Sequence, residues 1–208
     1  MHRKVLNLIL LTLFLVCGAQ AQTTQSTQTE KNDADVNLET QLYLILGTNQ
    51  AVPDSKIPSS LDPVIKQLRA TLPFKNYRLA TTLINRVKNE GKLEIVGIGS
   101  SLAATPEPGQ PITRSSFRVR DIRLFRGSEG QSMVQIAGFG FNASIPVVTN
   151  AAAIAANNAA PPVFAYEGAS LGTDISMREN EPVIVGTLNV GPSGDAIILV
   201  LAAKRTPK

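Results

Sequence analysis

The sequence predicts a mainly β fold (α+β by element count), namely an antiparallel β-sandwich or sheet with one amphipathic helix near its start. Apolar runs of strand length are separated by turns rich in Gly, Asn and Pro, and one early segment repeats its apolar residues at helical spacing. The most apolar later segment, 196–203, has the 8 residues typical of a buried strand. Two or more hairpins beside one helix favour an antiparallel sheet that the helix covers.

The first 21 residues have the layout of a secretory signal peptide. A basic head at 2–4 precedes a 12-residue apolar run at 5–16, and the small residues Ala19 and Ala21 follow. This run is too short for a permanent membrane helix, which needs about 20 apolar residues. We therefore expect cleavage after Ala21 and a periplasmic, outer-membrane-associated or extracellular bacterial protein.

Cleavage after Ala21 would remove the only cysteine, Cys17, and the only histidine, His2. The remaining 187 residues would then lack the usual ligands of zinc and iron, so we expect no metal site and no cofactor. Lys and Arg fall from 20 to 18 against 16 acids, which lowers the net charge from +4 to +2 and argues against nucleic acid as a partner. A lipid anchor at Cys17 is the alternative to cleavage.

Residues 38–208 are predicted to form one β-rich domain, because their length suits a single hydrophobic core. The polar residues 22–37 bury too little apolar surface to order themselves, so they predict a flexible tether. A first strand is expected at 41–47. The segment 151–162 is low-complexity and predicts a loop.

The predicted helix spans 61–72. Pro63 suits its first turn, Ser60 or Asp62 is the expected cap, and Leu72 before Pro73 ends it. Its apolar residues fall at helical spacing: Leu61, Val64, Ile65, Leu68 and Leu72.

Residues 77–87 fit both a helix face and a strand alternation. We favour the strand, because the turn at 89–91 then leads into a second apolar run. Further strands and a hairpin are expected in the later part of the chain, with turns at 178–180 and 191–194. These strands are 117–125, 132–145, 173–177, 181–190 and 195–203.

Several strings resemble catalytic or binding motifs, but their context favours structural roles. The segment 168–172 fits G-x-S-x-G with Ser170 as nucleophile, yet that chemistry needs a histidine and a strand-to-helix turn. Residues 33–37 begin like a calcium loop but lack its later glycine and glutamate. The glycines at 97–99 and 138–141 are interpreted as bulges or close backbone approaches. Carboxylates available for an acid pair are Glu94, Asp121, Glu167 and Asp174.

A basic strand is the strongest candidate for a contact surface. Five arginines crowd 13 residues, and a strand there places Arg118, Arg120 and Arg126 on one face with Arg123 opposite. Such a stripe suits an anionic lipid, a glycan or an acidic edge of a partner protein; a solvated face or an edge strand protected by charge is the alternative. The five are Arg114, Arg118, Arg120, Arg123 and Arg126.

The C-terminal residues 173–206 resemble the closing strands of the secretin family, the outer-membrane pores of type II secretion and type IV pilus systems. The string VIVGTL at 183–188 stands for the family's V-V-I-G-G-L-like strand, with Thr187 in place of the second glycine, and 197–201 for its last apolar strand. The resemblance implies a stand-alone β domain related to that system and not a full secretin. The alternative is that any β-hairpin would use these residues.

The preferred functional hypothesis is therefore a non-enzymatic envelope protein that binds another envelope protein, an accessory of an outer-membrane secretion or pilus assembly. A periplasmic or secreted module that binds a glycan or lipid through the arginine strand is the second. An envelope hydrolase using carboxylates or a Ser–Lys pair is the third.

Overall fold

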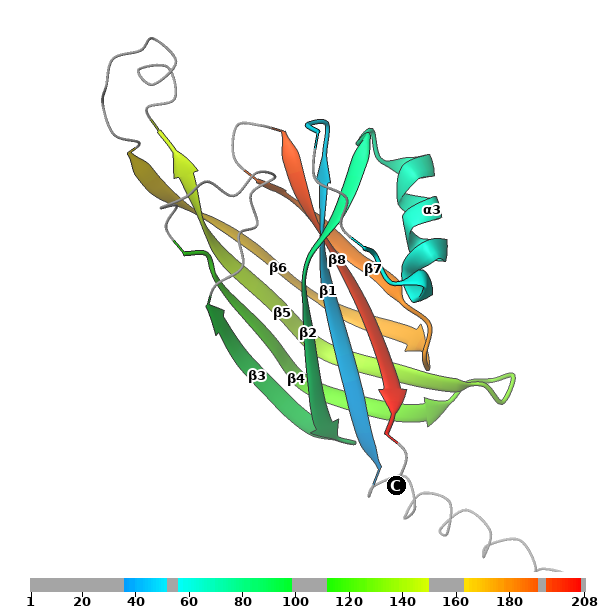
Figure 1. Ribbon diagram of the computed structural model, residues 1–208. Helices are drawn as coiled ribbons and strands as arrows, with labels where there is room; N and C mark the ends of the chain where they lie inside the picture. The colour runs from blue at the N-terminus through cyan, green and yellow to red at the C-terminus, as the bar shows by residue number, and fades with distance from the viewer. Residues whose placement is uncertain (1–35, 52–55, 99–111, 150–162, 191–193, 207–208) are drawn as a thin grey trace, which may run out of the picture. The chain divides into compact units, whose positions relative to one another are not determined.

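The computed structural model describes residues 36–51, 56–98, 112–149, 163–190 and 194–206, all within the compact unit Val36–Lys208 (Figure 1). These ranges contain two four-stranded antiparallel sheets and one α-helix. The predicted mainly β class, with a single early helix, is thus confirmed. The cleavage region, the tether up to residue 35 and the segment 151–162 lie outside the described residues.

We call the first sheet the covered sheet; its strand order is β2-β1-β8-β7. Its strands are β1 (Asn37–Thr48), β2 (Asn76–Lys88), β7 (Val183–Val190) and β8 (Asp195–Arg205). We call the second the open sheet; its order is β3-β4-β5-β6. Its strands are β3 (Gly91–Ile98), β4 (Arg114–Arg126), β5 (Ser132–Val148) and β6 (Phe164–Arg178).

The main core fills the space between the two sheets. Alternate residues of β1 and β8 point into it from the covered sheet, and aromatic and branched residues of β4 and β5 meet them. Phe117 and Phe139 pack with ring centroids 5.4 Å apart at its centre. Its buried residues include Leu42, Leu44, Leu46, Leu199, Leu201, Phe117, Phe139 and Phe141.

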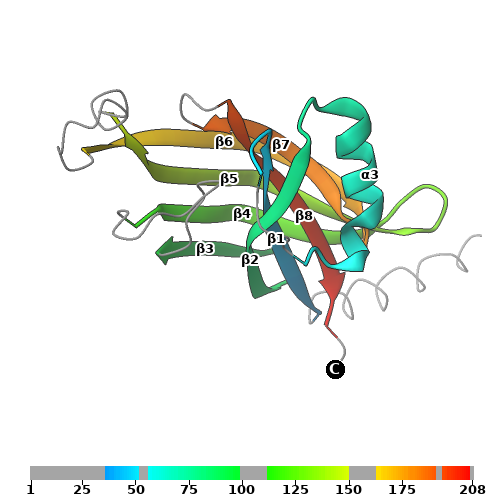
Figure 2. The ribbon, with the colours of Figure 1, turned by 45° about the horizontal axis from the view of Figure 1, so that its top comes forward.

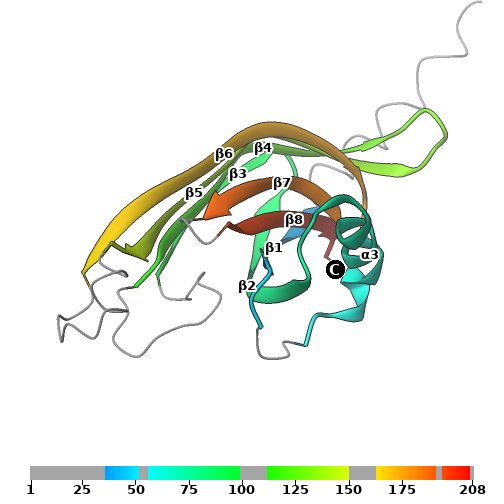
Figure 3. The ribbon, with the colours of Figure 1, turned by 90° about the horizontal axis from the view of Figure 1, so that it is seen from above.

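A second core lies on the other face of the covered sheet, beneath the helix. A 3-10 turn, η1 (Ser59–Leu61), leads into α3 (Asp62–Thr71), which is seen from two further sides in Figures 2 and 3. The buried Val64 and Leu68 of α3 pack against the sheet. Leu72 is extended, and the helix ends there because Pro73 follows. The sheet residues of this core are Tyr43, Ile45, Tyr77, Ile198 and Val200.

The predicted caps are wrong. The N-cap of α3 is Leu61, which has a helical backbone, and no side chain caps this helix or the 3-10 turn before it. The 3-10 turn winds the chain into the helix, so Ser60 lies inside that turn and Asp62 is already the first helical residue.

The chain passes between the sheets at two tight turns. Residues 77–87 belong to β2, which confirms the strand, and the turn after it places Glu90 at a φ of 62°. The side chain of Asn89 in this turn accepts a hydrogen bond from the Leu124 N–H at 2.8 Å. The β6–β7 turn places Asn180 at a φ of 65°, and its N–H donates to the Ala203 carbonyl at 2.7 Å. Each turn is therefore bonded to a strand other than the two that it joins.

No helix in the described part of the chain is long and apolar enough to cross a membrane. Within the same residues, no group of three or more His, Cys, Asp or Glu side chains gathers as a metal site.

Candidate functional site

A β-bulge in the open sheet decides where the arginines of β4 point. Phe117 and Val119 are buried before it, and Ile122 and Leu124 are buried after it, so the alternation shifts by one residue. The register of β4 against β3 shifts at the same place, because Val119 and Ile122, three residues apart on β4, pair with Leu93 and Gly91, two residues apart on β3. One extra residue on a strand produces this change of phase.

The predicted distribution of the arginines is wrong for this reason. Because of the bulge, Arg123 occupies an outward position of the strand, as Arg118 and Arg120 do. Arg126 occupies an inward position and is exposed because it lies at the end of the strand. Arg114 is exposed at the other end of β4. The outer face of the open sheet therefore carries a row of arginines along β4.

The charges in this row differ in their surroundings. Arg123 Nε lies 2.7 Å from Asp121 Oδ2, so its charge is paired. Among the described residues, no ion pair involves Arg118 or Arg120. Two free guanidinium groups are thus exposed side by side on one strand.

Glycines replace side chains beside these two arginines. Arg118 pairs in register with Gly140 of β5, and Gly140 pairs with Gly172 of β6. Gly138 lies next to Arg120, whose Nε occupies the place that a Cβ on Gly138 would take. The side chains of Arg118 and Arg120 therefore lie close to a strip of backbone without side chains, formed by Gly138, Gly140 and Gly172.

The strip is the floor of a groove of about 500 Å³ on the outer face of the open sheet. Arg118 and Arg120 line it from β4, and Ser170 and Asp174 line it from β6. Its other polar side chains are Asn142, whose Nδ2 donates to Ser116 Oγ at 3.4 Å, and Thr173, whose hydroxyl donates to the Asp174 carbonyl at 3.3 Å. The lining therefore offers many hydrogen-bond donors, several acceptors and two permanent positive charges.

Asp174 has a structural partner within the groove. Its Oδ1 accepts a hydrogen bond from the Gly138 N–H at 2.6 Å, where Gly138 adopts a φ of 62° at the bulge of β5. This bond satisfies a backbone donor that the strand ladder leaves free. The interpretation of Gly138 as a bulge glycine is confirmed.

The remaining candidate catalytic residues from the sequence do not form a catalytic site with the residues of the groove. Ser170 lies in the middle of β6, so no strand-to-helix turn presents it as a nucleophile. Register places Glu94 opposite Arg118, Asp121 opposite Ala137 and Glu167 opposite Ile145.

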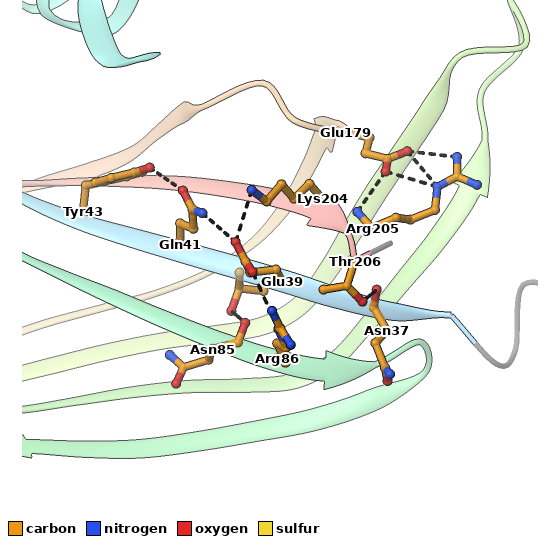
Figure 4. A network of polar contacts seen from close by, with 11 residues as sticks. Asn37, Glu39, Gln41, Tyr43, Asn85, Arg86, Glu179, Lys204, Arg205 and Thr206 are labelled. Atoms are coloured by element: carbon orange, nitrogen blue, oxygen red, sulfur yellow. Dashed lines mark hydrogen bonds and ion pairs between the residues drawn. The ribbon is translucent and has the colours of Figure 1, made fainter. Parts of the chain in front are cut away.

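A second polar network, which the sequence did not indicate, lies at the end of the covered sheet (Figure 4). Glu39 of β1 accepts a hydrogen bond from Gln41 Nε2 at 2.7 Å, and its carboxylate is 3.2 Å from Lys204 Nζ and 3.7 Å from Arg86 Nε. The hydrogen bonds from Gln41 and then Lys204 hold the pKa of Glu39 below its usual value.

Nearby, Glu179 in the β6–β7 turn binds Arg205 at the end of β8 through both carboxylate oxygens (Figure 4). Arg205 also donates to Ser132 Oγ at the start of β5, so this cluster ties the two sheets together. Burial alone raises the pKa of Glu179, but the hydrogen bonds and charge of Arg205 outweigh burial and lower it. Both networks are structural, because their polar groups are occupied by one another.

No protein-family model matches the chain, and no curated protein matches it. Among solved structures, the secretin InvG of the Salmonella SPI-1 type III secretion injectisome matches 86% of this chain and 67% of its own, with 8% identity and a TM-score of 0.38. The same secretin in its open gate state matches 89% of this chain and 67% of its own, with 9% identity and a TM-score of 0.38.

A chain of the Klebsiella pneumoniae type II secretion system outer membrane complex, which contains PulD, PulS and the PulC HR domain, matches 83% of this chain and 39% of its own, with 10% identity and a TM-score of 0.30. This chain thus spans between 39% and 67% of the lengths of these three. The matched structures are secretins or a secretin-containing complex, and they give no residue of this chain a role.

Proposed function

We propose that the protein is a non-enzymatic binding module of the bacterial cell envelope and that it holds its partner in the groove of the open sheet. The observation that carries this proposal is the pair of free guanidinium groups, Arg118 and Arg120, beside a strip of bare backbone. Guanidinium is permanently charged and bonds carboxylates or phosphates in a fixed geometry. The signal-peptide pattern of residues 1–21 supports export.

The groove is better suited to binding than to catalysis. Arginine cannot serve as a general base, and Asp174 already holds the Gly138 N–H. Ser170 is a weak nucleophile without an adjacent base, and none of the residues that line the groove is His, Lys or Cys. The side chains that line the groove are instead suited to hydrogen-bonding an anionic, polar surface.

The partner we favour is another envelope protein, at an outer-membrane secretion or pilus assembly. The resemblance of residues 173–206 to secretin closing strands makes these assemblies the first place to look. An acidic segment on such a partner would complement the two free arginines.

In-cell photo-crosslinking tests this proposal. A photoreactive residue replaces Asn142, which lines the groove, and a matched control replaces Lys66, which is exposed on α3. We expect an envelope protein to be crosslinked from position 142 and not from position 66. Equal or absent crosslinking at the two positions would reject the groove as the binding surface. N-terminal sequencing of the same sample, expected to begin at Gln22, tests export.

A second candidate is an anionic glycan or lipid headgroup in the same groove, favoured by the hydroxyl and amide groups of Ser170, Thr173 and Asn142. It predicts binding to glycans or anionic vesicles that weakens with salt and is lost on charge reversal by Arg118→Glu with Arg120→Glu. Position 142 would then capture glycan or lipid and no protein.

A further inference from the structure

Two of the glycines in the groove are not required by the fold. Gly140 and Gly172 do not have the positive φ that requires glycine. A Cβ on Gly140 would lie 3.7 Å from Arg118 Nε, and a Cβ on Gly172 would lie 3.8 Å from the Phe139 carbonyl oxygen, both ordinary contacts. Glycine weakens the interior of a strand, so its use here needs a reason other than backbone geometry or packing.

Gly138 provides the contrast. It has a φ of 62°, and Arg120 fills the space where its Cβ would be, so the bulge itself demands glycine there. Gly140 and Gly172 are paired across β5 and β6, and together they leave a gap in the outer layer of side chains. Gaps of this kind in a strand occur where a ligand or another backbone approaches closely.

The gap is elongated along β5. Its floor runs from Gly138 past Gly140 to Asn142, Arg118 and Arg120 form one wall, and the residues of β6 form the other. Arg118 and Arg120 are two residues apart on the same face, a spacing of about 6.8 Å along a strand. An extended polypeptide laid beside them repeats its own same-face side chains at that spacing.

We propose that this groove binds an extended acidic peptide segment of the partner protein, laid along β5 with a carboxylate on Arg118. This inference rests on the proposed function and names the chemistry of the partner. Asn142 and Ser170 would take the peptide's backbone N–H and C=O groups, and Thr173 Oγ1, which donates to the Asp174 carbonyl at 3.3 Å, would accept a backbone N–H. Phe139, the aromatic residue of the lining, is 2% exposed, so the groove offers no ring face to a sugar.

Arg118 contributes more than Arg120 in this arrangement. Arg120 and Asp174 both contact Gly138, so Asp174 offsets the charge at that end of the groove. Arg118 lies beside the two glycines, where the lining holds no acid; Glu94 on β3 is its neighbour in register but forms no ion pair with it. Asp174→Asn keeps the acceptor for Gly138 and removes the charge.

The test measures the binding of a fluorescein-labelled peptide of alternating Glu and Thr to the mature protein by fluorescence anisotropy at low salt. We expect binding to weaken by about tenfold when Gln replaces Glu in the peptide, and by about tenfold in Arg118→Gln, because each change removes a charge-assisted hydrogen bond. Arg120→Gln is expected to have a smaller effect. Asp174→Asn is expected to tighten binding.

Gly140→Val fills the gap and provides the decisive variant. We expect it to lose peptide binding while its thermal unfolding midpoint stays the same or rises, because valine favours a strand and its Cβ meets only ordinary contacts. Gly168→Val is the matched control. Gly168 is a glycine of the neighbouring strand β6 that does not line the groove, and a Cβ there has open space around it, so the variant's peptide binding should be unchanged.

A lower unfolding midpoint in Gly140→Val would overturn the inference, since the glycine would then serve the fold. Unchanged peptide binding in Arg118→Gln would overturn it as well, and so would tighter binding of an oligogalacturonate or of phosphatidylglycerol vesicles than of the peptide. Crosslinks from position 142 without peptide binding would reject the acidic peptide as the ligand and leave the proposed function standing. Absence of those crosslinks would reject the proposed function itself.

Discussion

The two sheets differ most on the faces they turn away from each other. On the covered sheet, Tyr43, Ile45, Ile198 and Val200 are all buried there, beneath α3. On the open sheet, the outward positions that line the groove hold Arg118 and other polar or glycine residues, and no described helix packs on them.

This difference follows from the strands themselves. The run Ala196–Leu201 of β8 is apolar at every position, and strands of this kind are stable only when both faces are covered. Strand β4 alternates buried and exposed side chains on either side of its bulge, so covering one of its faces is sufficient. A helix therefore completes the core on one side, while the other side stays available for a partner.

The largest expected effect comes from breaking the helix cover. Leu68→Ala removes a side chain that is 2% exposed between α3 and the covered sheet, and we expect it to lower the free energy of unfolding by about 2–5 kcal/mol. Arg118→Ala on the open sheet should change it by less than about 0.5 kcal/mol. Urea unfolding followed by far-UV circular dichroism measures both. Similar losses in the two variants would contradict the asymmetry between the faces.

An intermediate effect is expected at the bulge of the open sheet. Gly138→Ala forces a side chain into a φ of 62° and against Arg120, so we expect a loss of about 1–2 kcal/mol. Gly168→Ala, where a Cβ has open space, is the control and should be neutral or slightly stabilising by the same urea measurement. Equal stability of the two variants would mean that the bulge relaxes without glycine.

Most of the fold follows from local patterns in the sequence. The apolar spacing of 61–72 predicts the helix, and the turn at 89–91 correctly favours a strand over a helix for 77–87. The bulge of β4 was missed, although Val119 and Ile122 enclose two consecutive polar residues, Arg120 and Asp121, which is the signal of a shifted alternation. A strict period of two along β4 placed Arg123 on the wrong face.

The candidate site was predicted only in part, because half of it depends on register. The arginines of β4 are visible as a charged run, but the pairing of Gly140 with Gly172 joins residues of two strands and has no local signature. The same holds for Glu179 and Arg205, which are 26 residues apart, and for Arg205 and Ser132, which are 73 apart. Contacts of this range follow from how the two sheets pack.

The smallest effect is expected where the two sheets are joined. Glu179→Gln weakens the bonds to Arg205, whose side chain is 40% exposed, so we expect a loss of about 0.5–1 kcal/mol near neutral pH. The more exposed pair of Glu181 and Arg178, 3.9 Å apart, provides the control, and Glu181→Gln should change stability by less than about 0.3 kcal/mol.

The pH dependence of the difference in unfolding free energy between the wild type and Glu179→Gln shows whether the charge of Glu179 causes that difference. Because the pKa of Glu179 lies below the ordinary 4.5 in the folded protein, its stabilisation is complete above that pH and is lost as the pH falls through the folded pKa. Urea unfolding of the wild type and Glu179→Gln between about pH 7 and pH 3 should therefore show two free energies that converge below about pH 4.5. A constant difference would mean that the glutamine side chain at position 179 disturbs the turn sterically, and that the charge of Glu179 does not hold the β6–β7 turn to the end of β8.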